Sequence, residues 1–298
     1  MGRARVRAYP IPTRHFPRSQ RPRQPSRVPH SASAWAGLAL LVLVIVSVTL
    51  GPALLRQAPD AVAPEEALRG PSAGHLLGTD AFGRDVMSRL LHGGRLSLAA
   101  GATAVALAAV AGSLLGILAG YAGGAIDLVV SWLADMLLSF PGLLLALVLA
   151  WLFGRDMGKA ALAVAVASAP LYVRLARSGV RRVRRAPYVR AAEAVGVGHG
   201  RILLRHILPN VAGPLLAVGL LDLGWAVLHV SALSFLGVGA RPPQPEWGAM
   251  LSEARGYVRQ APWLGLAPGA AIAITVLSVN LLGEAWQEAL DPLRARRP

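Results

Sequence analysis

Cysteine is absent from this chain of 298 residues, and only 15% of the residues are charged. The absence of cysteine excludes disulfides, thiolate metal sites and cysteine nucleophiles. Lysine is nearly absent too, and the single Lys159 follows Gly158 without the spacing or the hydroxyl residue that a Walker A phosphate loop requires. His-Glu-x-x-His and Gly-x-Ser-x-Gly patterns are also missing. The sequence therefore predicts no catalytic residue, metal site or cofactor.

Hydrophobic residues make up 54% of the chain and gather in blocks. A run of about 20 apolar residues spans the hydrocarbon core of a bilayer. Because lipid offers no partner for backbone amides, each such block must be helical. We predict an all-α, polytopic membrane helix bundle with six transmembrane helices. The blocks lie approximately at residues 34–55, 96–121, 128–152, 160–176, 211–238 and 264–282.

Residues 1–33 contain eight arginines and no acid, so they form a basic arm that we expect to be disordered or to lie on anionic lipid. The first apolar block, 34–55, is too long for a signal peptide and lacks a clear cleavage site of small residues. We therefore expect it to be an uncleaved transmembrane anchor.

Arginine placement predicts the orientation. With a cytoplasmic amino terminus, the inside segments hold eight basic residues in 1–33, three in the tail, and nine from Arg174 to Arg205, at the end of the fourth block and in the loop after it, which is 20 of the 30. Both termini are then cytoplasmic. Residues 56–95 form an external segment, 96–285 a core that includes a cytoplasmic loop at 177–210, and 286–298 the tail. The net charge of +15 is thus explained by topology, and no nucleic-acid partner is predicted.

The loop between the fourth and fifth blocks contains a short helix signal. Pro187 can open a helix and Gly196 can end it with a turn. Such an exposed helix fits a groove on a partner protein. The alternative is an ordinary basic loop that rests on lipid headgroups.

This loop resembles the Glu-Ala-Ala loop of ABC importer permeases, in which an alanine pair is followed by a glycine and then by Leu-Pro. Arg190 replaces the leading glutamate, Glu193 supplies an acid, and His206 stands where many members have isoleucine. Both departures resemble the dipeptide, oligopeptide and nickel branch, and within it the second, dipeptide permease C-like subunit. The matching positions are Ala191, Ala192, Gly196, Leu208 and Pro209.

A second stretch, ahead of the second block, is similar to the segment that opens the conserved domain of this branch. Its acids and arginines, including Arg89, are close enough in sequence to pair with one another. We favour an external cap held by salt bridges over direct contact with substrate. The motif residues are Gly78, Thr79, Asp80, Gly83, Arg84 and Asp85.

Polar residues also occur inside the blocks. Asp222, Trp225 and His229 share one helical face, which either lines a translocation path or is satisfied within the packed bundle. Where the family often has an arginine three residues before Asp135, this chain has Trp132, so we expect Asp135 to lack that partner. In the second block, glycines at four-residue spacing, at 112, 116 and 120, permit close approach of another helix.

The resemblance implies alternating access by two homologous permeases in a bacterial or archaeal plasma membrane, with no cofactor. Its partners would be a second permease, two ABC ATPase subunits that hydrolyse ATP, an extracytoplasmic substrate-binding protein and membrane lipid. Dipeptides or oligopeptides are the expected substrates, with nickel or a metal-chelator complex as the alternative. A transporter driven by an ion gradient is the competing class, but it would predict an internal repeat, which the sequence does not contain.

Overall fold

Helices form all the regular structure of residues 32–55 and 57–290, which are the part of the chain that the computed structural model describes. The predicted all-α class is confirmed. The predicted segments 1–33 and 286–298 lie largely outside these residues. The long helices are α1 (Ala32–Leu54), α2 (Val86–Ala122), α5 (Met157–Arg184), α8 (Leu208–Phe235) and α10 (Trp263–Leu290). The shorter ones are α3 (Gly124–Leu138), α4 (Gly142–Phe153), α6 (Pro187–Ala194), α7 (His199–Ile202) and α9 (Trp247–Ala254).

Within the described part of the chain, five helical segments are long and apolar enough to cross a membrane, and the bent pair α3 and α4 makes a sixth if it counts as one span. The continuous helix predicted over 128–152 is wrong, because α3 and α4 meet at an angle of 97°. The break falls at Phe140-Pro141. Proline lacks the amide hydrogen that a helix needs and disfavours helical geometry in the residue before it.

Helix α2 begins ten residues before the apolar block that predicted it. The carboxylate of Asp85 caps the helix by accepting a hydrogen bond of 2.7 Å from the backbone N–H of Ser88. With 37 residues, α2 is about 55 Å long, which exceeds the hydrocarbon thickness of a bilayer. The helix therefore connects the two ends of the bundle.

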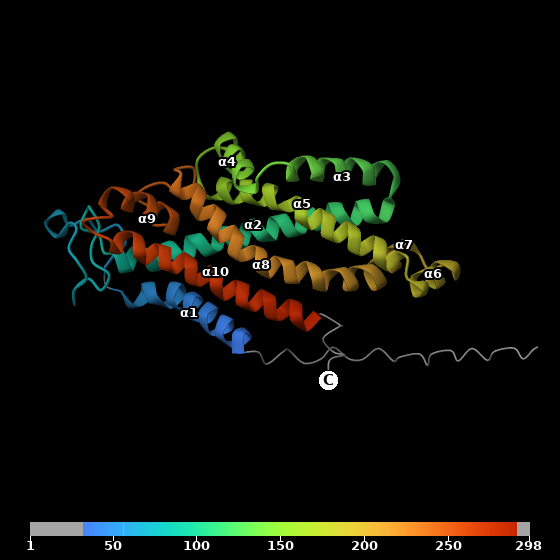
Figure 1. Ribbon diagram of the computed structural model, residues 1–298, viewed down its shortest axis with the longest axis horizontal. Helices are drawn as coiled ribbons and strands as arrows, with labels where there is room; N and C mark the ends of the chain where they lie inside the picture. Colours follow the sequence, from blue (N-terminus) through green and yellow to red (C-terminus); the bar gives the residue numbers. More distant parts are fainter. Residues whose placement is uncertain (1–31, 56, 291–298) are drawn as a thin grey trace, which may run out of the picture.

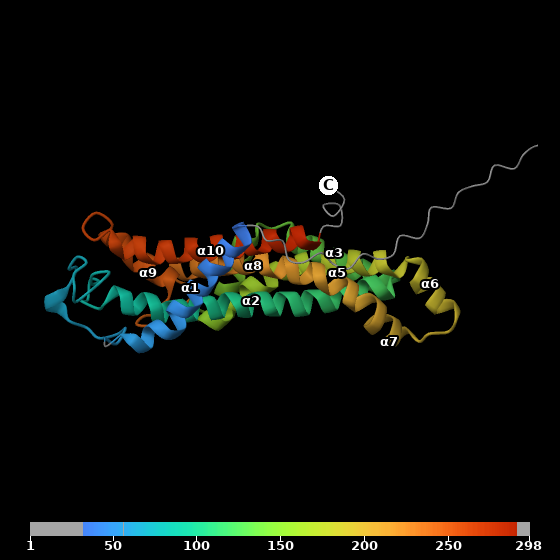
Figure 2. The same cartoon turned by 90° about the horizontal axis from the view of Figure 1, so that it is seen from below.

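The two ends of the bundle carry different kinds of structure (Figure 1). At one end lie the loop of residues 57–85, with its short 3₁₀ helix η1 (Pro64–Glu66), and helix α9 followed by η3 (Arg255–Tyr257). At the other end lie α6 and α7, which lead into α8 through the π-helical turn η2 (Leu203–Ile207). Figure 2 shows the same separation from a second direction.

Helices α2 and α5 pack closely along much of their length. An added Cβ at Gly112 or Gly116 would overlap the carbonyl oxygen of Ala169 or Val173 on α5, and one at Gly120 would lie 2.8 Å from the carbonyl oxygen of Arg177. The expected role of the glycine spacing is therefore confirmed. Small residues let helices in membranes approach backbone to backbone.

Replacing Gly116 with alanine is expected to destabilise the bundle. The new methyl group would overlap the Val173 carbonyl oxygen and lie 2.9 Å from the Cβ of Ala176, so α2 and α5 would have to separate. Overpacking of this kind costs about 1–3 kcal/mol. Thermal unfolding of the purified protein in detergent, followed by tryptophan fluorescence, measures the effect. The control is Gly142→Ala, because a Cβ at Gly142 meets no atom within 4 Å. Equal midpoints for the two variants would contradict the close packing.

Candidate functional site

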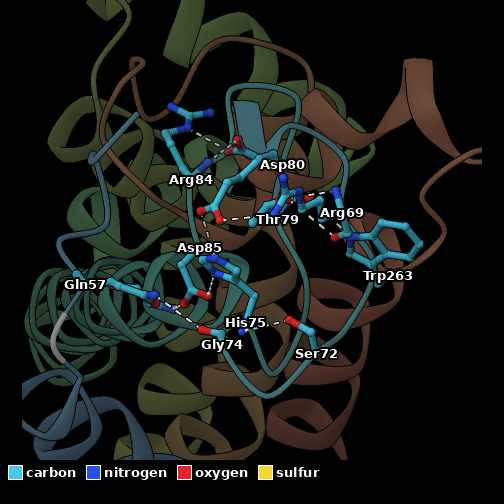
Figure 3. Close-up of polar contacts among 12 residues, drawn as sticks. Gln57, Arg69, Ser72, Gly74, His75, Thr79, Asp80, Arg84, Asp85 and Trp263 are labelled. Atoms are coloured by element: carbon cyan, nitrogen blue, oxygen red, sulfur yellow. Dashed lines mark hydrogen bonds and ion pairs between the residues drawn. The ribbon is translucent and has the colours of Figure 1, made fainter. Parts of the chain in front are cut away.

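The motif at residues 78–85 forms a loop whose polar groups bind one another (Figure 3). Gly78 and Gly83 have positive φ angles of 74° and 75°, which fold the loop tightly. The Asp80 carboxylate accepts hydrogen bonds from the backbone N–H of Arg84 at 3.0 Å and from its guanidinium at 2.6 Å. The predicted pairing of Asp80 with Arg84 is confirmed.

This loop is tied to helix α9 through Glu253, a partner that sequence reasoning missed. The Glu253 carboxylate accepts hydrogen bonds from Arg84 at 2.9 Å and from Arg89 at 3.0 Å. Arg89 also lies 3.5 Å from Asp80. Because Arg89 is only 1% exposed, its charge needs these carboxylates as partners. Glu253 follows Arg89 by 164 residues, so no local pattern could indicate the contact.

Thr79 connects the loop to the residues before it and to α10. The Thr79 hydroxyl accepts a hydrogen bond of 2.9 Å from the Arg69 backbone and donates one to the Glu66 carbonyl oxygen. The Thr79 carbonyl oxygen accepts a hydrogen bond of 3.3 Å from the Trp263 indole at the start of α10. The polar groups of the motif are therefore engaged with the protein itself.

His75 lies between two carboxylates. Its Nδ1 is 3.0 Å from Asp85 and its Nε2 is 3.1 Å from Glu66. The hydrogen bond to Asp85 and, after it, the contact with Glu66 raise the pKa of the His75 imidazole above its ordinary value, although partial burial opposes the shift. A protonated imidazole can donate to both carboxylates at once.

Glu246 anchors helix α9 to the bundle. This fully buried carboxylate caps the helix by accepting a hydrogen bond of 2.9 Å from the Ala249 backbone, and it accepts another of 2.8 Å from the Ser97 hydroxyl of α2. The neighbouring Trp247 donates its indole N–H to the carbonyl oxygen of Leu90 at 2.9 Å. Helix α9 is thereby fixed against α2.

The three polar residues predicted on one face of the fifth block occupy different environments. Asp222 is buried and accepts a hydrogen bond of 2.9 Å from the Tyr172 hydroxyl of α5. Trp225 is 57% exposed, and its ring lies 6.0 Å from the half-buried ring of His229. Asp222 is thus satisfied within the packed bundle by a neighbouring helix, as one of the two alternatives expects, and not by His229. Tyr172, which sequence reasoning missed, is the partner of Asp222.

Asp135 has an arginine partner after all. Arg174 of α5 donates hydrogen bonds of 2.7 and 3.1 Å to its carboxylate, so the expectation that Asp135 lacks such a partner is wrong. The expectation considered only a neighbour along the same helix, whereas the arginine comes from another helix. Nearer the α6 end, Arg177 and Arg181 bind Asp127 in the same way. Ion pairs thus join α3 to α5.

The segment at 187–210 folds locally as the sequence predicts. Pro187 is the first residue of α6, and Gly196 ends the turn after it with a φ of 80°. The backbone N–H of Gly196 donates to the Glu193 carbonyl oxygen at 3.0 Å. The predicted partner-binding residues lie on the surface, except that Ala192 and His206 are half-buried; the exposed ones are Arg190, Ala191, Glu193, Gly196, Leu208 and Pro209.

No group of three or more His, Cys, Asp and Glu side chains in residues 32–55 and 57–290 is arranged to hold a metal ion. The chemistry that the described residues offer is thus that of ion pairs, buried caps and exposed helical surface.

The position of His75 makes the stability of the protein dependent on pH. A raised pKa means that the contribution of protonated His75 is complete below the ordinary value of 6.5 and is lost as the pH rises through the folded-state pKa. We expect the thermal midpoint to fall as the pH rises above 6.5, and His75→Gln to reduce this dependence. The control is His92→Gln, because the His92 ring contacts a neutral group, the Ser88 carbonyl oxygen at 2.9 Å, and not a pair of carboxylates. An unchanged pH profile in His75→Gln would contradict the assignment.

A comparison with protein families matches residues 112–296 to the family described as binding-protein-dependent transport system inner membrane component. The match begins within α2 and includes α5, α6 and α8. The loop of residues 57–85 lies before it.

Curated relatives cover more of the chain. It is 41% identical over 259 residues to the dipeptide transport system permease protein DppC of Alkalihalophilus pseudofirmus, covering 87% of this chain and 85% of the relative. Identity to the di/tripeptide transport system permease protein DppC of Pseudomonas aeruginosa is 37%, covering 95% and 93%. The glutathione transport system permease protein GsiD of Pectobacterium atrosepticum is 39% identical, covering 86% and 85%. The chain belongs to the family of binding-protein-dependent transport system inner membrane components, the multi-pass permease subunits of ABC importers.

Proposed function

We propose that this permease carries dipeptides, and that it does so beside a second, homologous permease. An importer of this family works with ATPase subunits and with a substrate-binding protein, so the chain acts as one part of a larger assembly. Two separate ATPases would supply the hydrolysis, in keeping with the lack of a Walker A loop around Lys159. Membership of this family also argues against the alternative of a transporter driven by an ion gradient.

Dipeptides are favoured as the substrate because two of the relatives above are described as dipeptide or di/tripeptide permeases. The third relative is described as a glutathione permease, and glutathione is itself a small peptide. None of these three is described as a nickel permease, and the described residues hold no metal-binding cluster. Nickel or a metal chelator therefore has no support from these observations.

The observation that carries the mechanism is the exposed helix α6 at one end of the bundle. Its inner face is fixed, because Val189 is fully buried among side chains that include Val180 of α5 and Ile202 of α7. Its outer face carries Arg190 and Glu193, and the adjoining Val195 is 79% exposed. A helix held on one side and open on the other is suited to lie in a groove of an ATPase.

We place the α6 end in the cytoplasm, together with both termini. Most arginines of the chain lie in segments that this orientation puts inside, as the positive-inside rule requires. The opposite end would then be external, and the Asp80, Arg84 and Glu253 contacts would hold the external cap in shape rather than bind substrate. Residues 57–85 and α9 would face the substrate-binding protein.

The face of α8 with Asp222, Trp225 and His229 is the proposed wall of the translocation path. Exposed polar groups are costly against lipid and usually face a water-filled cavity or another helix. Trp225 and His229 lie toward the surface of this subunit. A second permease packed against this surface could form the opposite wall of the path. Asp222 lies deeper, held by Tyr172.

Replacing Gly196 with alanine should weaken attachment of the ATPase. A residue other than glycine at a φ of 80° costs about 1–2 kcal/mol, which would shift α6 or melt its end and reduce affinity about tenfold. Co-purification of the permease pair with its ATPases, and the ATP hydrolysis that the loaded binding protein stimulates, measure the effect.

The matched control is Gly198→Ala, two residues further on. Gly198 has an ordinary φ of −62°, and its Cβ would meet no atom within 4 Å, so the same substitution should change little. Membrane insertion of both variants is checked by fractionation. If the unaltered chain binds no ATPase, or if Gly196→Ala behaves as Gly198→Ala does, the proposed role of α6 is wrong.

A further inference from the structure

Tyr121, in the last turn of α2, touches the segment that contains α6 and α7. Its hydroxyl is 2.8 Å from Nδ1 of His199, the first residue of α7, and the two rings meet edge to face with centroids 5.9 Å apart. A residue of one membrane helix thus holds the far end of the segment, 78 positions later in the chain.

Arg184 of α5 reinforces the same junction. Its guanidinium lies over the Tyr121 ring at 4.9 Å and donates a hydrogen bond to the Tyr121 carbonyl oxygen. The same side chain lies 3.9 Å from Glu193 of α6. Three helices, α2, α5 and α6, and the start of α7 therefore meet around one tyrosine.

The connection from this segment to α8 is of a different kind. It passes through the π-helical turn η2 (Leu203–Ile207), and π-helical turns frequently mark functional sites within helices. Helix α8 then contains Gly213, where an added Cβ would meet no atom within 4 Å, and Pro214, which interrupts the helical hydrogen bonds. The segment is thus held to α2 by side chains and leads into α8 through a π-helical turn, beyond which Val211 packs in the same buried cluster as Val189.

We propose that Tyr121 is a positioning residue that makes α6 and α7 move as one body with the α2–α5 pair. This inference rests on the proposed function, in which an ATPase acts on α6. Force on α6 is then delivered to α2 and α5, which run to the other end of the bundle, while α8 bends at η2. Without the contact between Tyr121 and His199, movement of the ATPase displaces α6 and α7 but not α2 and α5. ATP is then hydrolysed with less substrate transported per ATP.

The direct test is Tyr121→Phe, which removes the hydroxyl and keeps the ring under Arg184. In vesicles with the full set of subunits, we expect ATPase attachment and stimulated hydrolysis to persist. Substrate transported per ATP should fall about twofold to tenfold, the shift that follows from losing one net hydrogen bond. The matched control is Tyr257→Phe, because the Tyr257 hydroxyl makes no hydrogen bond within the described residues.

Substitution of the partner distinguishes the hydrogen bond from the bulk of the ring. Asparagine at position 199 can place its amide oxygen close to the position of Nδ1, so His199→Asn should retain most of the coupling, whereas His199→Leu should lose it as Tyr121→Phe does. The double variant Tyr121→Phe/His199→Leu should be no worse than either single one, because both remove the same contact.

A cross-link gives an independent measurement, since the chain has no cysteine of its own. Tyr121→Cys/His199→Cys should transport poorly while reduced and should recover when a short bifunctional thiol reagent joins the two positions. If the link instead blocks transport, the two elements must separate during the cycle and the inference is wrong. It is also wrong if Tyr121→Phe keeps normal transport per ATP.

Failure of the unaltered chain to bind an ATPase would instead show as an absence of attachment in every variant, which overturns the proposed function as well.

Discussion

The close contact between α2 and α5 is the constraint on which the rest of the structure depends. Association of helices within lipid gains little from burying apolar surface, so it relies on packing and on polar contacts. Gly112, Gly116 and Gly120 bring the backbone of α2 against the carbonyl groups of α5. The resulting pair is the axis along which the other helices are arranged (Figure 1).

Polar contacts at each end of this pair hold the parts that we propose to face partners. At one end, Arg89 of α2 binds Glu253 of α9, and Glu246 fixes the start of α9 against α2. At the other end, Tyr121 and Arg184 hold the segment that contains α6. Because buried or half-buried charges are stabilised only with their partners in place, both ends have a defined shape. The closely packed pair therefore links the two ends of the bundle at which we propose that partners bind.

The sequence predicted what depends on local pattern. Apolar blocks predicted the membrane helices, Pro187 and Gly196 predicted α6, and the spacing of the glycines in α2 predicted a close interface. Partners distant in sequence could not be predicted in this way. Glu253 and Tyr172 carry no local signal for the residues that they bind, and the break at Pro141 was hidden because hydropathy remains high on both sides of it.

The chain belongs to a family of importer permeases and is similar to peptide permeases, and its buried charges Arg89, Asp222 and Glu246 are each held by partners within the chain. In an importer of this family the ATPases supply the energy and the binding protein supplies the substrate. The permease contributes the movement of its helices. Transport by such a permease thus depends on which helices move together. The proposed assignment is that α6 and α7 follow the α2–α5 pair and that α8 changes its angle at η2.

The most direct test of this claim is a distance measurement between spin labels. Single cysteines can replace the exposed Val110 on α2, Leu171 on α5 and Leu216 on α8, with no native thiol to interfere. In the reconstituted importer with and without ATP, pulsed electron spin resonance compares the pair Val110–Leu171 with the pair Val110–Leu216. If α6 and α7 follow the α2–α5 pair, the distance between α2 and α5 stays unchanged and the distance between α2 and α8 changes. A shift between α2 and α5 on ATP binding would contradict it.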